Sequence, residues 1–210
     1  MTKRLLIFVL AASVGCAASA FASSLNLSTG VPAGATYTVV EQNGYNLGAT
    51  ATATPVAPGD ADWFGGWLPD SSSSSWVAYD PNNCCDNGLG NYSTTFTLTA
   101  GDVSTVSLSG GWTLDDSGVL LLNGNVIGSV GDGSWGSFTS ASVAAGSPFF
   151  VVGTNTLSID ITDTDNFLEA VIFQGGLSGY TAATPEPSSL LLFGTGILAA
   201  ALFGRKLLAS

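Results

Sequence analysis

Apolar and polar side chains alternate with a period of two along most of the chain between residues 23 and 177. The clearest examples are Phe96-Thr97-Leu98 and the series in which Leu157, Ile159 and Ile161 alternate with polar residues. This period is typical of half-buried β-strands. Apolar residues nowhere in this region follow a convincing helical period over three turns. The sequence therefore predicts an all-β body.

Turn-forming residues separate the predicted strands. Asn123-Gly124 is the strongest hairpin signal, because both residues tolerate the positive φ that a tight two-residue turn needs. Nine short strands at this spacing are typical of an antiparallel β-sandwich, and a jelly roll is the expected form. The predicted strands are residues 36–41, 76–79, 92–99, 103–109, 118–123, 125–130, 137–143, 155–162 and 166–173.

The first 22 residues have the layout of a secretory signal peptide. Two basic residues precede an apolar stretch over residues 5–14, and Ala20 and Ala22 form a small-x-small cleavage site. We expect the mature chain to begin at Ser23. A second interpretation makes Cys16 a lipid-carrying residue.

The segment from residue 185 onward has three parts in a fixed order. Pro185-Glu186-Pro187 comes first, an apolar run over residues 190–204 follows, and Arg205-Lys206 comes last. A helix of 15 residues covers roughly 22 Å at ~1.5 Å per residue, which is short of the ~30 Å hydrocarbon core. A single transmembrane helix of this length would be marginal and would suit a temporary anchor.

These three parts resemble the PEP-CTERM sorting domain of Gram-negative bacteria. The resemblance implies that a membrane protease-transpeptidase, exosortase, recognises the Pro-Glu-Pro element and processes an inner-membrane-anchored precursor. It further implies an exported protein that reaches the cell surface or extracellular matrix. Many family members come from species that make extracellular polysaccharide, and the same tail is associated with ice-binding proteins as a C-terminal domain. An ordinary tail anchor is the alternative.

The expected organisation follows from these segments. It comprises a signal peptide (1–22), a β-sandwich domain (23–177), a small-residue linker (178–184) and the sorting domain (185–210) with its apolar helix (190–204).

All the basic residues lie in the two terminal segments. They are Lys3, Arg4, Arg205 and Lys206, and the chain contains no His. Of the 15 acidic residues only Glu186 lies outside the body, so the body holds 14 carboxylates and has a formal charge of −14. A body without Lys or Arg is not expected to bind nucleic acid or anionic lipid.

The absence of His from the sequence also excludes Ser-His-Asp and Cys-His catalysis. Catalysis would have to use carboxylates alone, as glycosidases do, or a bound metal. We therefore expect a protein that is not an enzyme, with a carboxylate-based glycosidase as the less favoured alternative.

A second resemblance covers residues 76–174. The series Asn91–Leu98, Trp112-x-x-Asp115-Asp116-x-Gly118, Leu122-Asn123-Gly124 and Gly153-Thr154-Asn155-Thr156-Leu157 is similar to galactose-binding-like jelly rolls. In sugar-binding relatives this region presents a ligand on one sheet, which makes Trp112 and Asp115 candidate ligand-binding residues. The alternative interpretation is a plain structural turn with Asp side chains capping backbone N–H groups.

Trp135 is the third candidate for ligand binding. It lies in the Gly-rich stretch 131–136, which is typical of an exposed loop. Exposed aromatic faces stack against the C–H faces of sugar rings. Core packing is the alternative for any single Trp.

Two further clusters have candidate chemistry. Asp160, Asp163 and Asp165 could hold Ca²⁺, which prefers oxygen ligands, although a solvated acidic turn is the alternative. No other cofactor is expected. Cys84-Cys85 could form a strained vicinal disulfide in an oxidising compartment, or pair between molecules.

Two hypotheses follow for the function. In the first, the exported body binds extracellular polysaccharide. In the second, the body is a structural component of the surface or matrix that associates with other copies of itself, through a strand edge or the Cys84-Cys85 pair.

Overall fold

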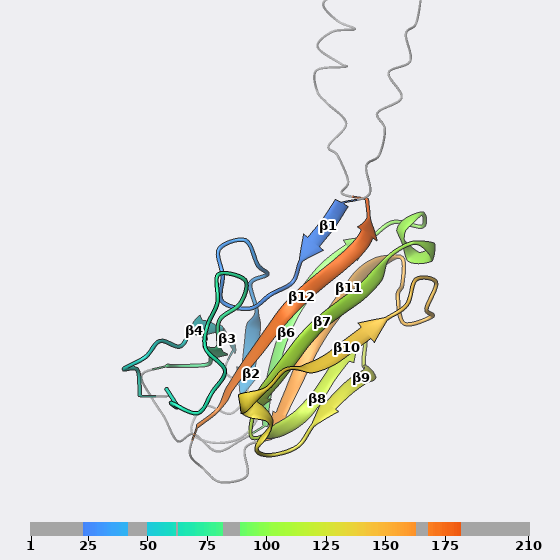
Figure 1. Ribbon diagram of the computed structural model, residues 1–210. Helices are drawn as coiled ribbons and strands as arrows, with labels where there is room; N and C mark the ends of the chain where they lie inside the picture. Colours follow the sequence, from blue (N-terminus) through green and yellow to red (C-terminus); the bar gives the residue numbers. More distant parts are fainter. Residues whose placement is uncertain (1–22, 42–49, 62, 82–88, 163–167, 182–210) are drawn as a thin grey trace, which may run out of the picture.

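The computed structural model describes residues 23–41, 50–61, 63–81, 89–162 and 168–181 (Figure 1). Several predictions lie outside these ranges: the signal peptide with Ala20 and Ala22, the Cys84-Cys85 pair, Asp163 and Asp165, and the sorting domain with its apolar helix. Within the described ranges, no helix has the length and apolar character needed to cross a membrane.

Two antiparallel sheets of six strands each make up the described body (Figure 1). The first sheet contains β10 (Thr139–Val143), β7 (Ser107–Asp115), β12 (Ala170–Tyr180), β5 (Val77–Ala78) and β4 (Thr54–Pro55), with β1 (Ser23–Asn26) also paired to β12. The second sheet contains β3 (Thr50–Thr52), β2 (Thr38–Glu41), β6 (Leu89–Leu98), β11 (Gly153–Thr162), β8 (Ser117–Leu122) and β9 (Asn125–Val130).

The main core lies between the two sheets. Strand β11 buries Leu157, Ile159 and Ile161, as its period-two pattern predicts, and β7 buries Leu108 and Trp112 from the opposite sheet. Each large apolar side chain removed from water contributes roughly 1.5–3 kcal/mol, so this layer accounts for most of the driving force for folding. The alternation of apolar residues is therefore the physical origin of the two-layer arrangement.

A second apolar cluster covers the outer face of the first sheet. Along β12, Val171 and Phe173 face the main core, whereas Ala170 and Ile172 face the second cluster. Leu168, just before β12, also belongs to this cluster. The loop between β4 and β5 supplies Val56, Trp67 and Trp76, with Trp63 and Leu68 packed at the margin. Part of the first sheet is consequently buried on both faces.

The all-β prediction is confirmed, and seven of the nine predicted strands agree with observed strands to within three residues at each end, whereas the predicted range 166–173 overlaps β12 only from Ala170. The predicted range 125–130 coincides with β9. The prediction for residues 103–109 is wrong at its start, because Asp102–Ser104 form a 3₁₀ turn (η1) and β7 begins only at Ser107. Strands β1, β3 and β4 were not predicted, and β12 continues to Tyr180, inside the segment expected to be linker.

Both ends of the described body leave it at the same place, which we call the chain-terminal end (Figure 1). Ser23 pairs with Tyr180 in the β1–β12 register, and Ser23 Oγ donates a 3.0 Å hydrogen bond to the Tyr180 carbonyl. The backbone N–H of Thr181 donates a 2.9 Å bond to Asp102 Oδ1. The opposite end, where β7 finishes at Asp115, is called the distal end.

Candidate functional site

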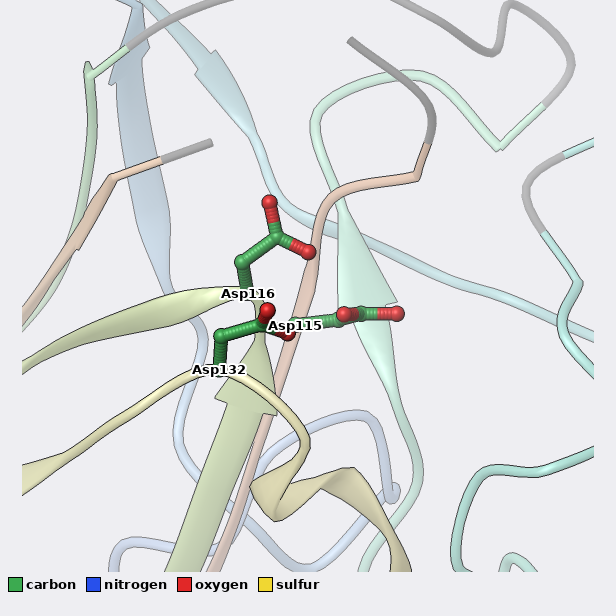
Figure 2. Close-up of side chains that lie close together, drawn as sticks. All are labelled: Asp115, Asp116 and Asp132. Atoms are coloured by element: carbon green, nitrogen blue, oxygen red, sulfur yellow. The ribbon is translucent and has the colours of Figure 1, made fainter. Parts of the chain in front are cut away.

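Three carboxylates meet at the distal end of the sandwich (Figure 2). Asp115 ends β7, Asp116 joins β7 to β8, and Asp132 follows β9. One carboxylate oxygen from each residue lies within 4.8 Å of the other two. Asp115 and Asp116 are only 6% and 4% exposed, whereas Asp132 is open to solvent.

A buried indole fixes the position of Asp115. Trp67 Nε1 donates a 2.7 Å hydrogen bond to Asp115 Oδ2. The Trp67 ring stacks on Trp76, with the ring centroids 4.5 Å apart and the planes inclined by 22°. Trp76 Nε1 in turn donates a 2.8 Å bond to the Leu68 carbonyl. The loop between β4 and β5 is therefore anchored to the end of β7 through aromatic side chains.

Aromatic rings extend from this anchor toward solvent. Trp63 makes an edge contact with Trp67 at a centroid distance of 6.0 Å, and Phe64 makes one with Trp135 at 5.9 Å. Phe64 is 36% exposed, and Trp63 and Trp135 are half-buried. We call Trp63, Phe64, Trp135, Asp116 and Asp132 the distal surface.

The loop after β9 places Trp135 beside the carboxylates. Gly133 has a φ of 83°, a left-handed conformation that side chains other than Gly rarely adopt, and it begins the short 3₁₀ turn Ser134–Gly136 (η2). Thr113 Oγ1 donates a 2.9 Å hydrogen bond to the Ser134 carbonyl, and the Leu68 N–H donates a 3.0 Å bond to the Trp135 carbonyl. Trp135 is thus held between β7 and the β4–β5 loop.

The structure brings two predicted site residues together and separates the others. Asp115 and Trp135 both lie at the distal end. The prediction for Trp112 needs correction, because its side chain is 0% exposed within the main core and cannot stack on a ligand. Asp160 lies on β11, where it accepts a hydrogen bond from Asn91 Nδ2, apart from the carboxylate cluster.

Sequence reasoning missed four members of the site. Asp116, Asp132, Trp63 and Phe64 come from three separate segments, and only the fold brings them together. The doublet Asp115-Asp116 at a predicted turn was the one available signal. Nothing in the sequence pairs this turn with the loop after β9 or with Trp67.

The three carboxylates have two chemical uses. They offer oxygen ligands for a hard cation such as Ca²⁺, which takes 6–8 oxygens, so other donors would have to complete its shell. They also accept hydrogen bonds from hydroxyl groups of a neutral ligand.

Comparison with known proteins identifies one segment. Residues 183–206 match the PEP-CTERM protein-sorting motif, which confirms the predicted sorting signal. No curated protein sequence matches the chain. The motif implies an exported protein that is anchored transiently to the membrane and has exosortase as its processing partner.

Proposed function

We propose that the protein is delivered to the cell surface or extracellular matrix, where its non-enzymatic body binds polysaccharide through the distal surface. The observation that carries the proposal is the distal surface itself, in which partly exposed aromatic rings lie beside acidic side chains. The sorting motif supplies the route. The class of ligand is inferred from the chemistry of these side chains.

Sugar recognition needs both kinds of group found there. An aromatic face binds the C–H face of a pyranose ring, and carboxylates accept hydrogen bonds from its hydroxyls. Phe64 and Trp135 supply the aromatic surface. Asp132, three residues before Trp135 in the chain, supplies an exposed carboxylate. A neutral polysaccharide suits this site better than an anionic one, because the body contains 14 acidic residues and no basic residue.

The proposed fold is a jelly roll similar to the galactose-binding-like domains. The support is the arrangement of strands, since β7, β12 and β10 adjoin in one sheet while β6, β11, β8 and β9 adjoin in the other. The body is proposed to bind rather than to cleave its ligand, since two of the three clustered carboxylates, Asp115 and Asp116, are buried. Binding is proposed to need no cofactor.

Binding of the exported protein to extracellular polysaccharide from its own strain tests this proposal. We expect Trp135→Ala and Asp132→Ala each to weaken binding about tenfold, equivalent to ~1.4 kcal/mol. Val152→Ala is the matched control, because Val152 is 62% exposed but precedes β11 at the chain-terminal end. Absence of binding by the unaltered protein to any polysaccharide would sink the proposal.

A further inference from the structure

We infer that the chain-terminal end of the sandwich is a lipid-contacting surface, on which the anchored precursor rests with its distal surface pointing away from the membrane. The inference rests on the membrane-anchored precursor of the proposed function. Three independent features of the described residues carry it: the place where the chain leaves the body, the distribution of charge, and a fixed apolar loop.

The first feature is the exit of the chain toward its sorting signal. Strands β1 and β12 pair so that Ser23 and Tyr180 are neighbours. The matched sorting motif begins at residue 183, two residues after Thr181. Pro185 follows Thr181 by four residues, which span at most about 14 Å at ~3.5 Å per residue. The processing partner must therefore reach the motif close to the chain-terminal end.

The second feature is the uneven distribution of charged side chains between the two ends of the sandwich. The segments that close the chain-terminal end are residues 99–106, 144–152 and 178–181, and Asp102 is their only charged residue. Asp102 is 1% exposed and accepts hydrogen bonds from Thr99 and Thr181, so it presents no charge to solvent. Among the described residues, the acidic residues at or near the distal end include Glu41, Asp115, Asp116, Asp132, Asp160 and Glu169.

This distribution limits the repulsion between the anchored body and an anionic lipid surface. A carboxylate at such a surface is repelled by the headgroups, but the repulsion falls off within a Debye length of about 8–10 Å. Strand β12 has 11 residues and spans roughly 33 Å at ~3.3 Å per residue. The distal carboxylates therefore lie beyond the range of headgroup repulsion when the chain-terminal end faces the lipid.

The third feature is an apolar loop that precedes β11. Val151 and Val152 are 43% and 62% exposed, so both present apolar surface to solvent at this end. They lie next to Gly153, which pairs with Leu98 at the end of β6. Thr99 follows directly and is hydrogen-bonded to Asp102, which in turn binds Thr181. The exposed valines and the exit of the chain thus share one end.

Two asparagines hold this loop in place. Asn155 is 0% exposed, its Oδ1 accepts from the Val151 N–H at 2.9 Å, and its Nδ2 donates to the Val151 carbonyl at 2.8 Å. Asn123 Nδ2 donates at 2.8 Å to both Asn155 Oδ1 and the Phe149 carbonyl. The Leu-Asn-Gly and Gly-Thr-Asn motifs of the sequence therefore fix the backbone that presents the valines.

Site-specific fluorescence on vesicles tests the inference. The full chain, with its three cysteines replaced by Ser, carries either Val152→Cys or Asp132→Cys with an environment-sensitive label. Both variants are added to vesicles of phosphatidylethanolamine and phosphatidylglycerol that contain nitroxide-labelled lipid. We expect several-fold stronger quenching at position 152 than at position 132. Introducing Val151→Asp should abolish that difference, whereas Ser129→Asp, which adds the same charge on β9, should preserve it.

Three results would overturn the inference. Equal quenching at the two positions on vesicle-bound protein would show that the sandwich has no preferred orientation. If the label at position 152 is shielded from solvent only when the processing enzyme is present, this end contacts the enzyme instead of lipid. Failure of the full chain to float with the vesicles would contradict the anchored precursor itself, while leaving polysaccharide binding by the distal surface to be judged by its own assay.

Discussion

The indole Nε1 of Trp67 donates a 2.7 Å hydrogen bond to Oδ2 of Asp115, a contact between residues 48 positions apart in the chain. Trp67 is 4% exposed and Asp115 is 6% exposed, so the bond lies away from solvent. It joins the long loop between β4 and β5 to the end of β7. The contact links the loop that carries Trp63 and Phe64 to the end of the strand that carries Asp115.

Replacing Trp67 by Phe removes this donor and leaves most of the packing in place. A buried carboxylate that loses a hydrogen bond costs about 1–3 kcal/mol, so we expect the free energy of unfolding to fall by ~2 kcal/mol. Urea denaturation at pH 7 measures the change. Trp63→Phe, in the half-buried ring that contacts Trp67, is the control and should cost less. Equal losses in the two variants would show that the hydrogen bond contributes little.

Asp102 should make stability depend on pH in the acid range. Burial tends to raise the pKa of its carboxyl, but hydrogen bonds from the side chain and backbone of Thr99 and from Thr181 outweigh burial and lower the pKa. A pKa lower in the folded than in the unfolded state stabilises the protein above about pH 4. This stabilisation is lost as the pH falls through the folded-state pKa.

The variant Asp102→Asn tests this pH dependence. Its free energy of unfolding should be lower than that of the unaltered protein at pH 7, and the difference should shrink as the pH falls below about 4. Urea denaturation across this pH range supplies the measurement. A difference that stays constant with pH would mean that the Asp102 carboxylate charge does not stabilise the fold.

Asn155 should be essential to the loop before β11. Its buried amide bonds the backbone on both sides of Val152, at Val151 and Gly153, and also binds Asn123. Asn155→Ala should destabilise the protein by roughly 2–4 kcal/mol, because buried backbone groups lose their partners. Thermal unfolding followed by circular dichroism measures it. Thr154→Ala, at the exposed neighbouring position, should change stability by less than about 0.5 kcal/mol.

Chelation distinguishes the two uses of the carboxylate cluster. If Asp115, Asp116 and Asp132 accept hydrogen bonds from a sugar directly, EDTA should leave polysaccharide binding unchanged. Binding to immobilised polysaccharide before and after dialysis against EDTA provides the comparison. Loss of binding that returns with Ca²⁺, but not with Mg²⁺, would instead make a calcium ion part of the site.

The sequence predicts the strands well where side-chain alternation is strong, as in β11 and β9. It fails where a strand is short or built from small residues. Strand β1 reads Ser-Ser-Leu-Asn and has too little alternation to stand out. The start of β7 was misplaced because Val103 and Val106 suggest a strand, while Asp102 caps a tight turn through its bonds to Thr99.

The candidate site could be predicted only in part, because it depends on contacts distant in sequence. Trp135 is predicted from a local loop pattern, and Asp115 from the resemblance to galactose-binding-like jelly rolls. Trp112 was assigned to ligand binding on resemblance, yet the period-two register of β7 directs it into the core. The role of Trp67 follows from a contact between the outer loop and β7, which no local pattern encodes.

The intact mass of the exported protein tests the central claim most directly. An exported protein processed at its sorting motif should begin at Ser23 and lack the apolar run and the Arg205-Lys206 pair that follow Pro187. Glu186→Ala, which alters the motif, should leave these residues in place. A mass that retains residues 188–210 in the unaltered exported protein would contradict processing at this motif.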